Sequence, residues 1–343
     1  MQVSSGSMRL SSGVFLCLAA LLALIPLGGC TRLQIKLGMR VPLATLPVTS
    51  MEASLPKEPA IAPGQKSPLV VHFSTSDGKT WQTEGQGGGK ILWSDLTVTP
   101  TIVTVNNKGV LSLARDPRLS DGKTGKVVIT APSHPDLRAE LEVPLRYNIA
   151  YRANFSGANG TSGFDGTAGL DGSSGSDGAI DPNDPAAGPS AGGNGTDGGN
   201  GSDGSNGGNG GDAQSVQVWL APHPGPQALI EAKVQAGKGR PRYYLIDPNG
   251  GSLSVTADGG DGGKGGKGGR GGRGGSGGSG SPPGFSGADG HDGMDGHDGS
   301  DGNGGQITVT CDPAVRQWLP IAKLSAFRGP KPIINTAPVP PLW

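Results

Sequence analysis

Two stripes of opposite charge recur at every third position in the glycine-rich stretch near the end of the sequence. The basic stripe is Lys264, Lys267, Arg270 and Arg273, and the acidic stripe is Asp292, Asp295, Asp298 and Asp301. If the chain folds back at the intervening Pro282-Pro283, the stripes meet as ion pairs running from Arg273–Asp292 to Lys264–Asp301. A slip of three residues would keep most pairs. Exposed ion pairs stabilise a fold only slightly, so we expect this charge zipper to select the register of two segments rather than to perform a reaction.

Histidines in the same stretch contain metal-ligating groups, but their spacing argues against a metal site. His291 and His297 are six positions apart, or roughly 18 Å on an extended three-residue helix. Ligand distances of about 2 Å exclude one shared ion unless another segment contributes, so both are interpreted as part of a solvated edge. Gly122-Lys123-Thr124 lacks the first glycine of a phosphate-binding loop. Since no nucleophile–base pair is apparent either, we expect no enzyme, cofactor or metal.

Cys30 follows a positively charged start at Arg9, an apolar run over Val14–Leu27 and two glycines. The apolar run is about half as long as a membrane-spanning helix, which favours a signal peptide. Leu27-Gly28-Gly29-Cys30 resembles the bacterial lipobox, in which the signal is removed and the cysteine is lipidated. The resemblance implies a signal peptide over 1–29 and a membrane anchor at Cys30. Thr31, which is not aspartate, implies the outer membrane. The alternative is an ordinary secretory signal that happens to contain a cysteine.

Composition limits the remaining possibilities. The charges of the 28 basic and 28 acidic residues cancel. This argues against a general nucleic-acid binder, which carries an excess of basic residues. With 64 glycines and 4% aromatic residues, much of the chain cannot build an ordinary apolar core. Cys17 leaves with the signal and Cys30 is lipidated, so Cys311 remains alone and no intramolecular disulfide is expected.

The segment 30–67 is rich in proline and small residues, which is typical of a tether. The segment 68–147 alternates apolar and polar residues between turn signals, which predicts a β-sandwich. Its predicted strands are Leu69–Phe73, Thr80–Thr83, Ile91–Trp93, Ile102–Val105, Val110–Leu113, Lys126–Thr130 and Ala139–Leu145. Trp93-Ser94 and the segments Val103–Gly109, Val127–Ile129 and Leu141–Val143 resemble bacterial immunoglobulin-like domains of surface proteins.

Glycine recurs every third residue in two arms, 157–211 and 259–305, within a predicted β base over 148–313. This is the period of an extended polyproline-type helix. Collagen shares the period but normally carries proline at many other positions, and a flexible glycine–serine linker needs no period. A bundle of polyglycine-type helices fits better, because each arm breaks at turn residues, Ala179–Pro189 and Ser281–Gly284. Two hairpins then give four helices, each roughly 60–70 Å long, and 259–278 should be the most enclosed. A C-terminal tail over 314–343 follows.

This layout resembles the polyglycine-helix bundles of snow-flea-type antifreeze proteins, phage tail-tip adhesins and the glycine-rich domain of Obg-family GTPases. The resemblance covers roughly 147–310 and carries no functional residues across. We therefore expect a mainly β, non-enzymatic cell-envelope lipoprotein that acts as a structural or adhesin-like projection. Its expected partners are the membrane, through Cys30, and envelope proteins or glycans, without nucleic acid. The alternatives are an ice- or water-surface-binding protein that uses a flat face of the bundle, and a disordered glycine-rich spacer.

Overall fold

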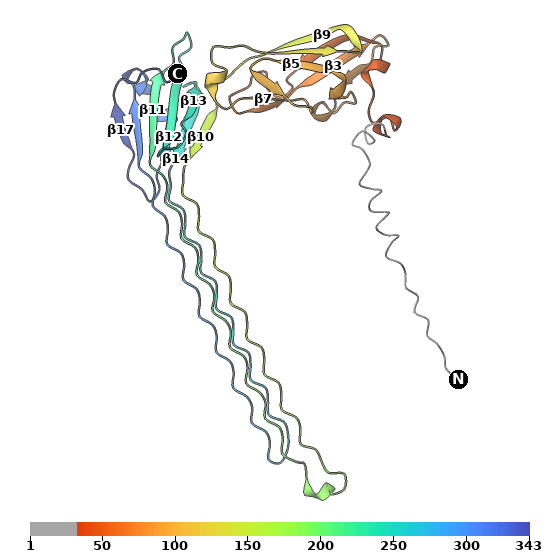
Figure 1. Ribbon diagram of the computed structural model, residues 1–343, viewed down its shortest axis with the longest axis vertical. Helices are drawn as coiled ribbons and strands as arrows, with labels where there is room; N and C mark the ends of the chain where they lie inside the picture. The colour runs from red at the N-terminus through yellow and green to blue at the C-terminus, as the bar shows by residue number, and fades with distance from the viewer. Residues whose placement is uncertain (1–32) are drawn as a thin grey trace, which may run out of the picture. The chain divides into compact units, whose positions relative to one another are not determined.

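The computed structural model describes residues 33–343, and the chain divides into two compact units at the boundary between Arg146 and Tyr147. Both units are mainly β and contain several sheets, whose strands are coloured by their order in the chain in Figure 1. Each unit has its own cluster of buried apolar side chains.

The first unit contains three sheets of three strands, with the orders β1-β3-β4, β2-β7-β6 and β5-β8-β9. The strands are β1 (Val48–Ser54), β2 (Lys66–Pro68), β3 (Val70–Thr75), β4 (Thr80–Gln82), β5 (Thr97–Pro100), β6 (Val103–Val105), β7 (Val110–Leu113), β8 (Gly125–Ala131) and β9 (His134–Val143). Alternate residues of β8 are fully buried, among them Val127 and Ile129. They pack in one core with Phe73 and Leu111 from the other sheets. One apolar cluster therefore holds the three sheets together.

Two expectations for this part of the chain are wrong. The predicted tether over 30–67 contains β1, which pairs antiparallel with β3, so the folded unit begins before residue 68. β1 is only partly buried and its flanks are rich in proline, which obscured its alternation. The predicted strand Ile91–Trp93 is also absent, because Trp93–Asp95 forms a 3-10 turn. The other six predicted strands overlap observed ones.

The second unit has a five-stranded sheet, β13-β12-β11-β15-β17, and a three-stranded parallel sheet, β10-β14-β16. The strands are β10 (Ala150–Asn154), β11 (Val216–Pro222), β12 (Ile230–Ala236), β13 (Arg242–Ile246), β14 (Ser252–Thr256), β15 (Ile307–Cys311), β16 (Ala322–Ser325) and β17 (Ile333–Thr336). Their inward side chains form one core that includes Val218, Val255 and Val309. Cys311 belongs to this core as a free cysteine, and burial raises the pKa of its thiol.

Residues 314–343 are part of the second unit and not a separate tail. β16 pairs with β14 and β17 pairs with β15, so this segment extends both sheets. Near its end, the Leu342 amide donates a hydrogen bond of 2.6 Å to the fully buried carboxylate of Glu231. Glu231 also contacts His223 Nδ1 at 3.0 Å. The last residues of the sequence are thus held by a polar contact in the base.

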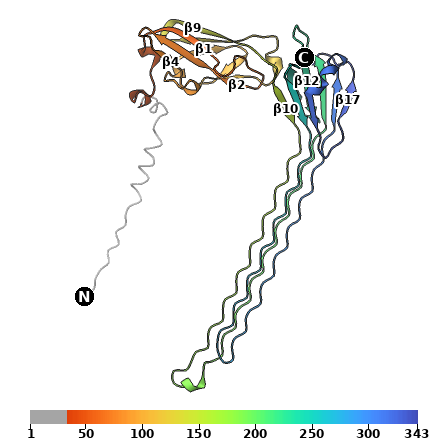
Figure 2. The same cartoon turned by 180° about the vertical axis from the view of Figure 1, so that it is seen from behind.

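Four extended glycine arms connect strands of the second unit: arm 1 (157–178), arm 2 (192–211), arm 3 (259–280) and arm 4 (284–305). In both views they leave the same end of the sheets and run side by side to turns at their far end (Figures 1 and 2). Arm 1 continues β10 and arm 3 continues β14, whereas arms 2 and 4 lead back into β11 and β15.

Backbone hydrogen bonds of 2.6 to 3.0 Å join the arms at every third residue. Gly163 N–H donates to the Lys264 carbonyl, which joins arms 1 and 3, and Gly269 N–H donates to Ser202, which joins arms 3 and 2. Arm 4 donates to arm 3 from glycines such as Gly293. Arms 2 and 3 each bond to the other three arms, while no backbone bond joins arm 1 to arm 4 among residues 33–343.

Arm 3 is the most enclosed arm, as the sequence predicts. It carries two glycines in each triplet, and the series from Gly260 to Gly278 is buried at every third residue. A Cβ atom built on Gly269 would lie 2.0 Å from the Thr167 carbonyl oxygen of arm 1. Since backbone and not a flexible side chain occupies that space, only glycine fits there.

We therefore expect Gly269→Ala to lower the free energy of unfolding of the second unit by about 2 kcal/mol or more, since overpacking usually costs about 1–3 kcal/mol. Arg270→Ala changes the exposed edge of the same triplet and should have little effect. Thermal unfolding followed by circular dichroism compares the two variants. Equal melting temperatures would contradict the close packing of arms 1 and 3.

Candidate functional site: the polar edges of the glycine arms

Cys30, the predicted lipidation site, lies outside the described residues. The other predicted site residues, the two charge stripes, lie on the outer edges of arms 3 and 4. The basic stripe is exposed, and the structure places it beside the acidic stripe in antiparallel arms. The register, however, differs from the predicted one.

Lys264 Nζ lies 2.7 Å from Asp298 and is not paired with Asp301 as predicted. This is a slip of three residues, one triplet. Among residues 33–343, Lys264–Asp298 is the ion pair between the two stripes, so Lys267, Arg270 and Arg273 do not form the predicted ladder. The reason is that the aspartates have another partner in the backbone of arm 3.

Each aspartate of arm 4 accepts a hydrogen bond from a glycine N–H of arm 3. The acceptors Asp289, Asp292, Asp295, Asp298 and Asp301 bond to Gly274, Gly271, Gly268, Gly265 and Gly262 at 2.7 to 2.9 Å. A carboxylate that receives a backbone N–H satisfies a donor that an extended segment leaves open. The acidic stripe therefore stabilises the backbone first, and its charge pairing is secondary.

Equivalent side-chain ladders join the other arms, and the sequence analysis missed them. The carboxylates of Asp165 and Asp171 on arm 1 accept the N–H groups of Lys267 and Arg273. The N–H groups of arm 4 have acceptors on arm 2 and its continuation, which are Asn194, Asp197, Asn200, Asp203, Asn206, Asn209 and Asp212. Their three-residue spacing was visible in the sequence and could have identified them.

The edge between arms 1 and 2 has a different character, because hydroxyls replace the carboxylates. Ser202 and Ser205 accept the N–H groups of Thr167 and Phe164 at 2.8 and 2.7 Å. Phe164 and Leu170 project from this edge with 84% and 83% of their surface exposed. The arms thus present one edge of hydroxyls and apolar groups besides edges of amides, carboxylates and cations.

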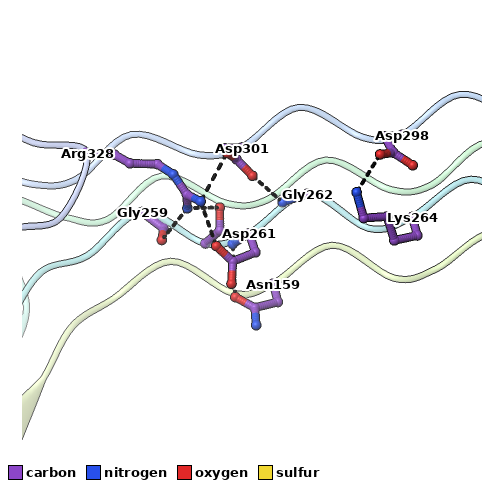
Figure 3. A network of polar contacts seen from close by, with 9 residues as sticks. Asn159, Gly259, Asp261, Gly262, Lys264, Asp298, Asp301 and Arg328 are labelled. Atoms are coloured by element: carbon purple, nitrogen blue, oxygen red, sulfur yellow. Dashed lines mark hydrogen bonds and ion pairs between the residues drawn. The ribbon is translucent and has the colours of Figure 1, made fainter.

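Arg328 links arms 3 and 4 at the end where they meet the sheets. Its guanidinium contacts Asp261 of arm 3 at 2.7 Å and Asp301 of arm 4 at 3.0 Å, as Figure 3 shows. Its carbonyl accepts the N–H of Gly304, and its backbone has φ 60, in the left-handed region that non-glycine residues rarely adopt. Arg328 lies in the loop between β16 and β17, so the C-terminal segment positions it.

Hydrogen bonding alters the acidity of the exposed stripe. The Lys264 ammonium, and then the Gly265 N–H, lower the pKa of the Asp298 carboxyl below its ordinary value. The same contact raises the pKa of Lys264. On arm 1, hydrogen bonds from the side chain and backbone of Ser279 lower the pKa of Asp177. In each case the folded arms favour the ionised carboxylate.

No protein-family model, curated protein or solved structure matches the chain. Across the described 311 residues (343 − 32), no cluster of three or more His, Cys, Asp or Glu side chains is placed to hold a metal ion. In the same span, no helix has both the length and the apolar content to cross a bilayer. What the geometry of the arms offers is a long, periodic polar surface.

The lowered pKa of Asp298 gives the arms a predictable response to acid. A carboxyl whose pKa is lower in the folded state contributes stability above its unfolded pKa and loses it as the pH falls through its folded pKa. Titration of the full chain by nuclear magnetic resonance should show Asp298 ionising below pH 3.8, its ordinary value. Lys264→Gln should move that midpoint upward, because the lysine is the main cause of the shift. An unchanged midpoint in this variant would contradict the ion pair.

Proposed function

We propose that the protein is a non-enzymatic, lipid-anchored cell-envelope protein whose glycine arms form a rigid structural or adhesin-like projection. The observation that carries this proposal is the continuous ladder of backbone hydrogen bonds between the arms, fixed at one end by paired β strands. A projection of this kind needs no cavity, and the pKa shifts on the arms come from exposed contacts rather than from an enclosed site.

We propose further that the arms are a bundle of four polyglycine-type helices. The three-residue period of the hydrogen bonds, together with the close approach at glycine edges, supports this interpretation over a disordered spacer. A collagen-like triple helix is less well supported, since the arms bond to one another within one chain. For the first unit we propose an immunoglobulin-like sandwich, supported by its short paired strands around one apolar core.

The ligands that suit the arm edges are envelope proteins and glycans. Asparagine, aspartate, serine and threonine side chains repeat along the edges at intervals of about 9 Å, three residues at roughly 3.1 Å each. Such small polar groups match hydroxyl-rich ligands better than apolar ones. The net charge of zero argues against nucleic acid.

Hydrogen exchange tests the rigid projection. We expect the arm 3 amides from Gly260 to Gly278 to exchange slowest among the glycine arms, because they are buried and bonded to arm 2. Exchange of the full chain followed by mass spectrometry or nuclear magnetic resonance measures this. Arm glycines that exchange at the rate of an unfolded chain, with rapid proteolysis of both inserts, would instead indicate a spacer.

Ice binding is a second candidate, favoured by the hydroxyl edge of arms 1 and 2, where Thr167 Oγ1 and Ser202 Oγ lie 3.1 Å apart. It requires thermal hysteresis in solutions of the full chain. Freezing and melting points that coincide would exclude this use of the arms while leaving the projection itself intact.

The anchor is tested separately. We expect Cys30→Ser to abolish the acyl mass on the mature protein and to move it from the membrane to the soluble fraction of cells, because one acylated cysteine is the proposed attachment. Cys17→Ser, within the predicted signal, should leave both properties unchanged. Retention of Cys30→Ser in the membrane fraction would show that attachment does not depend on this cysteine. Fractionation of the two membranes would then test the proposed outer-membrane location.

A further inference from the structure

A shallow groove lies on the outward face of the parallel sheet β10-β14-β16 and reaches the strand ends that lead into arms 1 and 3. Its volume is about 360 Å³. Its polar lining residues are Arg152, Asn154, Ser252, Ser254, Thr256 and Lys323. The inward residues of the same strands, such as Ala153 and Val255, are buried in the core, so the sheet supports the groove rigidly.

Strand register places the charged residues of the groove in one row. Arg152 of β10 is paired with Ser254 of β14, and Ser254 is paired with Lys323 of β16. Adjacent strands lie about 4.8 Å apart, so the two basic residues flank the serine at Cα positions about 10 Å apart. The row therefore reads cation, hydroxyl, cation across the sheet.

The two cations have no carboxylate partner among residues 33–343. Further along this face, the Asp258 carboxylate accepts hydrogen bonds from Ser325 and Phe327 and so is already engaged. Asn154 likewise uses its carbonyl oxygen for the Thr256 hydroxyl and the Ser156 amide, which leaves its NH₂ group as a donor. The groove thus combines positive charge with donors and lacks an internal counter-charge.

We infer that this groove binds an oxyanion, a carboxylate or phosphate group that is either free or carried by an acidic saccharide. Arginine can donate two parallel hydrogen bonds to such a group, and lysine adds a compact charge from the other side. Ser254 lies between them and can donate a third hydrogen bond. The hydroxyls of Ser252 and Thr256 extend the polar surface along β14, which suits the neighbouring hydroxyls of a saccharide.

Calorimetric titration of the purified full chain tests the inference with three probes: inorganic phosphate, a uronic-acid oligosaccharide and its neutral methyl ester. We expect at least one of the two anions to bind, and the neutral ester to bind more weakly than that anion. Phosphate alone would identify a free anion as the ligand, whereas preference for the uronic acid would identify the saccharide. Arg152→Gln and Lys323→Gln should each weaken binding about tenfold, as expected for loss of a hydrogen bond to a charged group.

Matched controls are available in the turn between β12 and β13, where Lys238 and Arg240 are exposed. Lys238→Gln and Arg240→Gln remove the same charges outside the groove and should leave binding nearly unchanged. Equal weakening by these controls would assign binding to general surface charge and overturn the inference. Failure of both anions to bind, or binding of the neutral ester as tight as that of the anion that binds, would overturn it as well. Melting temperatures equal to that of the parent chain establish that the groove variants are folded.

Discussion

The second unit depends on the close approach of glycine backbones. An extended segment has no internal hydrogen bonds, so each arm must find partners for its N–H and C=O groups in neighbouring arms. Cβ atoms built on the facing glycines would overlap backbone carbonyl oxygens at about 2 Å. The arms therefore approach most closely along edges without side chains, whereas arm 2 also bonds to arm 1 through the backbone of residues with small hydroxyl side chains, such as Ser202 and Ser205. This constraint explains why the inner arm 3 has two glycines in each triplet and the outer arm 1 has one.

The base supplies the register that glycine alone cannot define. Ala150 pairs with Ser252, an offset of 102 (252 − 150), and the Asp165 side chain bonds to the Lys267 amide at the same offset of 102. Val216 pairs with Ile307, an offset of 91 (307 − 216), and Asp203 bonds to Met294 at 91. The pairing of the strands thus continues without a shift into the arms. Side-chain acceptors along the arms and Arg328 at their root reinforce it.

The sequence predicted the features that are periodic and local. The three-residue glycine period, the turns at Ala179–Pro189 and Ser281–Gly284, and the enclosure of arm 3 all follow from residue spacing. The predicted charge zipper is one triplet out of register because backbone N–H groups, and not the basic side chains, are the main partners of Asp292 to Asp301.

Features that depend on distant segments were missed. Arg328 reaches Asp261 across 67 positions (328 − 261), with no local signal. β17 is exposed at every position, so it lacks the alternation that predicts a strand. β1 was hidden by its low burial and its proline-rich surroundings. In each of these cases, tertiary pairing and not local pattern defines the structure.

The shared offsets restrict how the length of the arms can change over evolution. A triplet inserted into one arm would shift every hydrogen bond beyond it and leave that arm longer than its neighbours. A viable change must add or remove whole triplets at the same level in all four arms, so that the offset of each parallel pair stays the same along its whole length. Related proteins should therefore differ in reach by discrete steps of about 9 Å, three residues at roughly 3.1 Å each. Intermediate lengths would be excluded because the hydrogen bonds between the arms recur at every third residue.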